Sequence, residues 1–409
     1  MSASVPAVEL PVPADPLQIR PIAWLTLGHG LVDLCQGLVP ALVAYLVTRE
    51  DYSYAASAGL VFATSALSSV VQPLFGQWAD KGTVPHLLPI SVLLAGCAFA
   101  IGTQTQFYPV LLLACAASGL GIAAFHPEAA RRTFLAAGPR RTTAMSYFSL
   151  GGSIGFAVAP MLGTLLLTNF GRRGVLWVIP LAVAVAIPLA WEFSRPAAPR
   201  VRSAAPPQGA DNWTGFWILS VAVIARSIVF FGINTFLALH WRQHWNVELT
   251  GGTFAASTFL MCGVIGTLLG GWCGDRLGRR AVIQMGFGLS TLLFPCVFLA
   301  PDPRVGLVLL GLLAAMFFAP SSPSVVLGQE YLPHRVGVAS GVTIGLAVST
   351  GGMVTPLLGR LGDVAGLQIV FVVLNGLLAV CFLSTCLLPA IPPAKPNSTT
   401  SGPPPDQRA

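Results

Sequence analysis

Two charged side chains lie deep inside long apolar stretches of the sequence. Asp33 comes 11 residues into the stretch 22–46, and Arg226 comes 12 residues into the stretch 214–240. At ~1.5 Å per helical residue, they lie about 16 and 18 Å from the start of their stretches. A lone charge at the centre of a bilayer costs about 2.5–3.5 kcal/mol, so each needs a partner or a wet cavity.

These two charges could do complementary chemistry. A carboxylate whose environment changes can bind and release a proton, so we expect Asp33 to carry a coupling proton. The planar guanidinium of Arg226 suits a carboxylate or phosphonate head group. The alternative is that both side chains only lock helices together.

Further polar residues share helix faces with these charges. His29, Asp33 and Gln36 are spaced i, i+4 and i+7, and Arg226 and Asn234 are eight residues apart. We therefore expect His29, Gln36 and Asn234 to bind substrate beside Arg226.

A second polar group, His126 and Glu128, comes near the end of the apolar stretch 107–128. Counted from the outer face, these residues fall near the inner mouth, and Arg131 and Arg132 follow one turn later. The group is either a proton entry or a structural lock at the helix end.

The elements that position these residues follow from composition. Apolar residues make up 54% of the chain and charged residues 9%, against about 25% charged in a soluble domain. Backbone groups in lipid must be satisfied within the chain, so long apolar stretches become helices. We predict an all-α polytopic membrane protein with twelve transmembrane helices as two six-helix repeats, near 22–46, 53–79, 87–104, 107–128, 144–168, 174–193, 214–240, 250–273, 281–299, 304–327, 336–360 and 367–388.

The two halves repeat short motifs. GFAVAPMLG at 155–163 matches GGMVTPLLG at 351–359, and GQWADKG at 76–82 matches GWCGDRLGRR at 271–280. Such a parallel repeat is typical of transporters whose halves rock about a central site. The first pair predicts close packing and bends at Gly155, Pro160, Gly163, Gly351, Pro356 and Gly359. The second predicts a gate in which a carboxylate clamps arginines and helix N-termini in one conformation, with Gly76, Asp80, Lys81, Gly271, Asp275, Arg276, Arg279 and Arg280.

Charge placement sets the expected topology. With a cytoplasmic N-terminus, inner segments hold 15 Lys and Arg residues and outer loops hold 6, which places both termini in the cytoplasm. The net charge of +7 thus reflects topology and not nucleic-acid binding. The expected organisation is a cytoplasmic tail (1–21), a six-helix bundle (22–193), a linker (194–213), a second bundle (214–388) and a disordered tail (389–409).

Other function classes lack their residues. The sequence contains no phosphate-binding P-loop string and no Ser/Lys dyad or Asp pair in facing spans, so we expect no enzyme, cofactor or metal site. The expected partners are a small-molecule substrate, protons and the lipid bilayer, and the expected unit is a monomer in a bacterial inner membrane.

Several strings resemble the major facilitator superfamily. The run 271–280 is similar to its motif G-x-x-x-D-R/K-x-G-R-R, whereas the first copy lacks the arginine pair after Lys81. The run 155–163 resembles its antiporter motif, with Ala159 in place of a glycine. GHGLVDLCQGLVPAL (28–42), SSVVQPLFGQWAD (68–80), GLGIAAFHPEAARR (119–132) and QEYLPHRVGVASG (329–341) resemble its fosmidomycin-resistance branch.

This resemblance implies a secondary transporter that exports a drug or small anion by proton antiport, and hence antibiotic resistance. The alternative is proton-linked uptake of a sugar, organic acid or other small metabolite, because a symporter and an antiporter can share every feature above.

Overall fold

The computed structural model describes residues 17–52, 56, 59–64, 71–81, 86–194, 210–246 and 249–389. Most of the predicted tails and linker, and part of the predicted span 53–79, lie outside these residues. Within them the secondary structure is entirely helical, as predicted.

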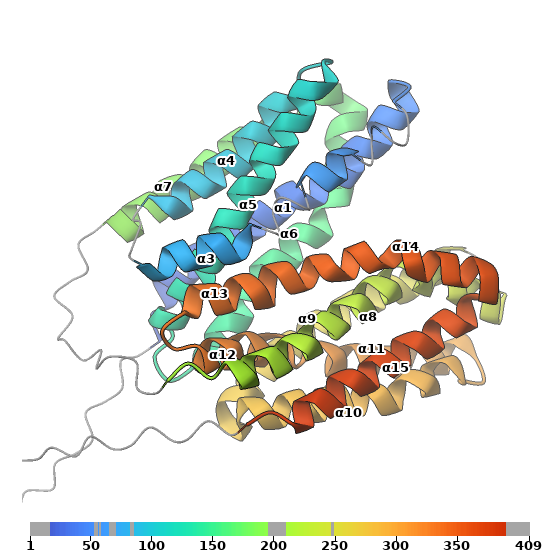
Figure 1. The fold of residues 1–409 in the computed structure, drawn as a ribbon. Coiled ribbons are helices and arrows are strands. Elements are labelled where there is room, and N and C mark those ends of the chain that lie inside the picture. Colours follow the sequence, from blue (N-terminus) through green and yellow to red (C-terminus); the bar gives the residue numbers. More distant parts are fainter. Residues whose placement is uncertain are drawn as a thin grey trace, which may run out of the picture.

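The helices gather into two bundles (Figure 1). The first contains α1 (Ile19–Arg49), α3 (Gln72–Lys81), α4 (Leu87–Gly102), α5 (Tyr108–Ala136), α6 (Arg141–Phe170), the 3₁₀ segment η1 (Gly171–Trp177) and α7 (Val178–Ser194). The second contains α8 (Trp213–Trp245), α9 (Leu249–Leu277), α10 (Arg279–Phe298), α11 (Pro303–Phe318), α12 (Ser321–Tyr331), α13 (Val336–Ser340), the π-helical segment η2 (Gly341–Leu346), α14 (Ala347–Ala365) and α15 (Leu367–Cys386).

The lengths of these helices agree with a membrane protein. Nine helical runs in the described part are long and apolar enough to cross a bilayer, and one of them, 141–193, covers two predicted spans. The shorter helix α4 covers a further span, and the predicted span 53–79 is described only in part. Large apolar side chains such as Leu165, Ile187 and Leu292 are exposed on the outside, where lipid would cover them.

The first repeated motif packs equivalent helices together in the two bundles. A Cβ on Gly155 would overlap the carbonyl oxygen of Gly30, so α6 lies directly against α1. In the second bundle, a Cβ on Gly351 would overlap Ser227, so α14 lies against α8 in the same way. Gly163 also contacts α1, through Ala41.

The other residues of this motif contribute less to close packing. A Cβ on Gly359 would be 3.8 Å from Phe236, which is an ordinary contact. Pro160 and Pro356 lie inside α6 and α14.

The bundles meet at one end and separate toward the other (Figure 1). The contacts between them join α3 and α5 to α13 and η2, and α6 to α9 and α12. At the first crossing the backbones touch, because a Cβ on Gly76 would overlap the Gly337 carbonyl oxygen. The predicted inner segments lie at this closed end, so the fold corresponds to a conformation closed on the predicted cytoplasmic side.

Candidate functional site

The polar centre of the first bundle is a cluster of three side chains, which we call the Asp33 cluster: Asp33, His29 and His126. His29 Nε2 lies 3.3 Å from Asp33 Oδ2, and His126 Nε2 lies 3.1 Å from Asp33 Oδ1. Each imidazole is fixed by its other nitrogen, because His29 Nδ1 lies 2.8 Å from the Phe148 carbonyl oxygen and His126 Nδ1 lies 2.8 Å from that of Ile122. One carboxylate is thus held between two oriented histidines.

The helices explain how the cluster is built. His29 and Asp33 are one turn apart on α1, and α5 brings His126 to the opposite carboxylate oxygen. Helix α6 contributes Gly152, where a Cβ would lie 2.5 Å from both Asp33 Oδ2 and His29 Nε2. A larger residue at this position would therefore push the ends of the Asp33 and His29 side chains aside. The Asp33 side chain is 19% exposed, and the two imidazoles are 8% and 6% exposed.

The prediction for His126 was wrong in position. We expected it near the inner mouth, but α5 continues ten residues beyond it to Ala136, which is about 15 Å of helix. His126 therefore reaches the depth of Asp33. The apolar stretch ended at 128 because charged residues follow, whereas the helix continues past them.

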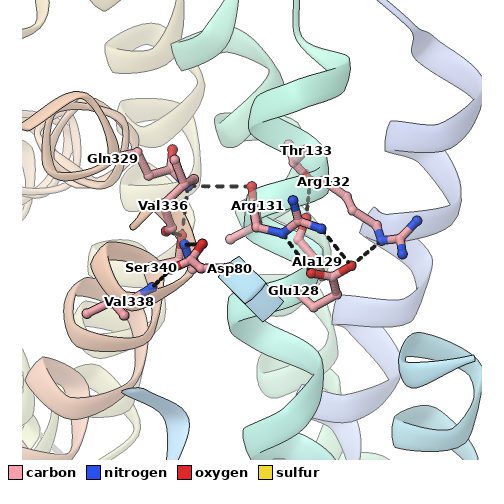
Figure 2. A network of polar contacts seen from close by, with 12 residues as sticks. Asp80, Glu128, Ala129, Arg131, Arg132, Thr133, Gln329, Val336, Val338 and Ser340 are labelled. Carbon is pink, nitrogen blue, oxygen red and sulfur yellow. Dashed lines mark hydrogen bonds and ion pairs between the residues drawn. The ribbon is translucent and has the colours of Figure 1, made fainter. Parts of the chain in front are cut away.

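Glu128 does not join this cluster. Its carboxylate is fully buried and accepts hydrogen bonds from Arg131, at 2.8 and 3.2 Å, and from Arg132. Figure 2 shows this group beside the contact between the bundles. These contacts pair Glu128 with the two arginines one turn onward on α5, and its role as a proton entry or as a structural lock stays a prediction.

The polar centre of the second bundle is Arg226 on α8. It donates to Ser321 Oγ at 2.6 Å and to the Phe317 carbonyl oxygen at 3.4 Å. Its guanidinium carbon lies 4.9 and 5.4 Å from the ring centroids of Phe317 and Phe318. Among the residues that the structure describes, no carboxylate lies within ion-pair distance of Arg226.

Two further residues, Asn234 and Gln36, were predicted to bind substrate beside these centres. Asn234 donates to the Phe230 carbonyl oxygen of its own helix, at 2.9 Å. Gln36 is half-buried on α1, three residues beyond Asp33. Asp33 and Arg226 belong to different bundles and form no ion pair in the described part of the chain.

The sequence reasoning missed Ser321 and the two phenylalanines around Arg226. A signal for Ser321 was present in the repeat. The offset of 196 residues that relates Pro127 to Pro323 pairs His126 with Ser322, directly beside Ser321.

Two carboxylates join the bundles at the closed end. Asp80 accepts from the backbone N–H groups of Gly337 and Val338, at 2.7 and 3.0 Å, at the start of α13 (the first latch; Figure 2). Asp275 accepts from the backbone N–H and the hydroxyl groups of Thr142 and Thr143, at 2.7–2.9 Å, at the start of α6 (the second latch).

Each latch thus places a carboxylate at a helix N-terminus of the other bundle, where the helix dipole and free N–H groups stabilise negative charge. Burial raises the pKa of the Asp80 carboxyl, although the two N–H donors oppose this shift.

The repeated glycines allow these approaches. Gly76 lies at the crossing of α3 with α13, and a Cβ on Gly271 would lie 2.5 Å from Ser146 Oγ on α6. Two of the sequence-predicted latch residues are therefore placed between the bundles.

The basic residues of the motif behave differently from one another. Arg279 lies 3.8 Å from Asp275 and 3.3 Å from Glu330, which also binds Arg141 of the first bundle at 3.2 Å. The other basic residues point elsewhere: Arg276 stacks on Trp272, Arg280 donates to the Cys386 carbonyl oxygen, and Lys81 lines a cavity of about 420 Å³ with Asp211, His334 and Arg335. The expectation that Asp275 clamps the arginines thus holds for Arg279 alone.

The Asp33 cluster is also where the described residues could hold a metal ion, since its three ligand atoms lie within 4.8 Å of one another. The sequence predicted no such site, because the three residues come from distant positions.

Comparisons with known proteins agree with this architecture. The family model described as "Major Facilitator Superfamily" matches residues 25–344 and 219–407, so it covers both bundles. An uncharacterised MFS-type transporter of Bacillus subtilis is 30% identical over 402 residues, covering 93% of this chain and 97% of its own length. A fosmidomycin resistance protein of Escherichia coli is 27% identical, covering 85% of this chain and 87% of its own length.

The fold is also similar to that of FucP, a fucose:proton symporter of E. coli, solved in the outward conformation. The TM-score is 0.72 at 15% identity, with 91% of this chain and 99% of the other covered.

Proposed function

The chain belongs to the major facilitator superfamily and is an integral membrane protein that acts as a secondary transporter, and we propose that it moves a small organic anion together with protons. The single observation behind this proposal is the contrast between the two centres. The first bundle holds the titratable Asp33 cluster, and the second holds a permanently charged arginine that has no carboxylate partner among the described residues.

Arg226 is the proposed docking point for the anion. A guanidinium has five N–H donors, and the contacts above use two of them, to Ser321 and to the Phe317 carbonyl. The remaining donors suit a planar carboxylate or a phosphonate. The rings of Phe317 and Phe318 beside the charge favour a substrate with an apolar body. We propose that Gln36 and Asn234 add polar contacts from the first helix of each bundle.

Protons and anion reinforce each other in this arrangement. Protonation of the Asp33 cluster removes negative charge from the substrate path, so an anion at Arg226 is held more tightly. This sign of coupling favours cotransport, in which both species cross in the same direction. A transporter that exchanges protons for substrate needs the opposite sign, because each must weaken the binding of the other.

Export by proton antiport is the second candidate. It is supported by the similarity to the fosmidomycin resistance protein and by the antiporter-like run at 155–163. The two candidates differ in the direction in which protons move when substrate moves.

The latches supply the proposed conformational cycle. In this conformation both latches are formed and hold the bundles together at the proposed cytoplasmic end. Breaking both latches would free the bundles to rock into the opposite conformation. One chain contains both centres and both latches, so we propose that a monomer is the working unit, in a bacterial inner membrane with both termini in the cytoplasm.

The test uses the purified protein in liposomes with a trapped pH dye and three probes: fosmidomycin, benzoate and succinate. Cotransport predicts that an inward anion gradient acidifies the lumen, whereas antiport predicts that it becomes alkaline. Asp33→Asn should remove either signal, and Asp363→Asn, an exposed carboxylate, should leave it unchanged. Movement of a neutral sugar with no anion movement would overturn the anion assignment.

A further inference from the structure

A cavity of about 420 Å³ lies between the two bundles at their closed end, beside the first latch. The first bundle lines it with Asp80 and Lys81 of α3, and the second bundle lines it with Asp211, His334 and Arg335. Figure 2 shows Asp80 at this contact between the bundles. Because its walls belong to different bundles, the cavity exists only while the bundles are together at this end.

Both carboxylates of the cavity already accept hydrogen bonds. The two oxygens of Asp80 accept from the backbone N–H groups of the first latch, at 2.7 and 3.0 Å. The two oxygens of Asp211 accept from the backbone N–H of His334 and from Arg335 Nε, each at 3.2 Å. A cation would have to displace these donors beside two basic side chains, so the carboxylates do not make this a cation site.

The basic side chains of the cavity have donors to spare. The ammonium group of Lys81 has three N–H donors, and among the described residues it has no hydrogen-bond or ion-pair partner. Arg335 has five N–H donors, and in the described part of the chain its side chain donates only through Nε, to Asp211. The guanidinium carbon of Arg335 lies 5.7 Å from the centroid of the Trp213 ring, which helps to hold the side chain in place. The cavity therefore suits a ligand that is rich in acceptors.

We propose that this cavity binds a phosphate-bearing anion, which bridges Lys81 of the first bundle and Arg335 of the second. A phosphate group offers several charged acceptor oxygens, which both an ammonium and a guanidinium bind well. The anion comes either from solution or from the head group of an anionic lipid, since the two share this chemistry. The site is separate from Arg226 and from the Asp33 cluster, so it goes beyond the proposed substrate and proton sites.

A ligand in this cavity acts on the conformational equilibrium. It contacts both bundles only when they are together, so it stabilises the conformation in which both latches are formed. If the open conformation does not bind it, a ligand at ten times its Kd raises the ratio of closed to open molecules about elevenfold. The anion thus inhibits transport from the proposed cytoplasmic side. This step rests on the proposed function, in which the bundles rock after both latches break.

The experiment measures the distance between the bundles at the closed end, without a substrate or a proton gradient. Spin labels are placed at Leu135 on α5 and Leu277 on α9, which are exposed near the inner ends of their bundles. Genetically encoded labels keep the eight native cysteines in place. Pulsed distance measurements then give the closed fraction of the wild type and of Asp275→Asn, whose weaker second latch populates the open conformation more.

The two sources of the anion are tested in separate arms. In phosphatidylcholine nanodiscs, a closed fraction that rises with added inorganic phosphate identifies a soluble ligand. A closed fraction that rises in phosphatidylglycerol nanodiscs without added phosphate identifies a lipid head group. Either result supports the proposal if Lys81→Gln and Arg335→Gln respond about tenfold more weakly. No change in either arm, or an undiminished response in both variants, overturns it.

Arg140→Gln is the matched control. Arg140 is an exposed arginine directly before α6 at the same end of the molecule, and it does not line the cavity. This variant should respond as the wild type does, and a response lost here as well would overturn the site, because it would reflect the general charge of the surface. Without ligand, Lys81→Gln should show the wild-type distance. A shift without ligand would make Lys81 part of the latch and overturn its role in binding.

The result is separable from the proposed function. If the distance responds to the anion but the liposome assay shows no linked movement of substrate and protons, the proposed function fails and the regulatory site stands. If linked movement is found but the distance does not respond, the regulatory site fails and the proposed function stands. Lys81 is exposed at the end of α3, so Lys81→Gln decides the result even if Arg335→Gln does not fold.

Discussion

The two bundles have matching frameworks but different centres. In each, a repeated glycine motif packs the first helix against the fifth, and a repeated carboxylate reaches a helix N-terminus of the other bundle. At the centre, however, the first bundle has the titratable Asp33 between two histidines, whereas the second has Arg226 held by Ser321.

This difference suggests a division of labour. We propose that the repeated helix contacts and latches carry the conformational change. The two centres differ in their role, since the Asp33 cluster binds protons and Arg226 binds the anion. A site in which one wall changes its charge and the other keeps it can link proton binding to anion binding. The predictions below test whether the centres are separable in this way.

The largest effect should come from Asp33→Asn. Without the carboxylate, the first centre cannot change its charge, so proton-driven accumulation of the anion should disappear completely. Exchange of labelled for unlabelled anion across the membrane needs no net proton movement and should persist. Loss of both activities to the same extent, measured in liposomes, would mean that Asp33 is structural.

Arg226→Ala should weaken anion binding about 10- to 100-fold, since a hydrogen bond to a charged group is worth about 1.5–3 kcal/mol. Arg226→Lys keeps the charge but loses the planar guanidinium, so its affinity for the anion should lie between those of the wild type and Arg226→Ala. Equilibrium binding of the transported anion measures the effect, with the exposed Arg304→Lys as the control. Wild-type affinity in Arg226→Lys contradicts bidentate docking.

The latches should respond unequally. The second latch has four hydrogen bonds, two of them from threonine hydroxyls, and the first has two. We expect Asp275→Asn to cost the closed conformation about 1–2 kcal/mol, which shifts the equilibrium about 5- to 30-fold, and Asp80→Asn to shift it less. Spin labels at the predicted outer ends report the shift by pulsed distance measurements. Equal shifts would show that the extra hydroxyl contacts do not matter.

The smallest effect should come from Gly152→Ala. Its Cβ would lie 2.5 Å from Asp33 Oδ2 and His29 Nε2, so these side-chain ends must move apart. An overpacking cost of about 1 kcal/mol corresponds to an approximately fivefold loss of proton-linked transport. Gly376→Ala is the matched control, because a Cβ there contacts nothing within 4 Å. Equal activity of the two variants would show that the cluster tolerates displacement.

Much of the frame could be predicted from sequence because it depends on local periodicity. Apolar length fixes the spans, and the spacing i, i+4 places His29 beside Asp33. The carboxylates of both latches were also predicted, because their motif occurs twice in the chain. The first latch forms without the arginine pair that its copy of the motif lacks, since its partners are backbone N–H groups.

The contacts between helices could not be predicted in this way. His126 reaches Asp33 because α5 continues past the charged residues at which the apolar stretch ends. The partners of Asp80 are backbone N–H groups, which leave no mark in the sequence. The sequence predicts that Arg226 and Asp33 share a depth, but they belong to different bundles and form no ion pair in the described part of the chain.

The central claim, that proton loading on one bundle strengthens anion binding on the other, is tested most directly by proton exchange on binding. The transported anion is added to detergent-purified protein in weakly buffered solution with a pH indicator. The account predicts that wild-type protein takes up protons as the anion binds, and that Asp33→Asn takes up none. Release of protons by the wild type would contradict the claim and support antiport.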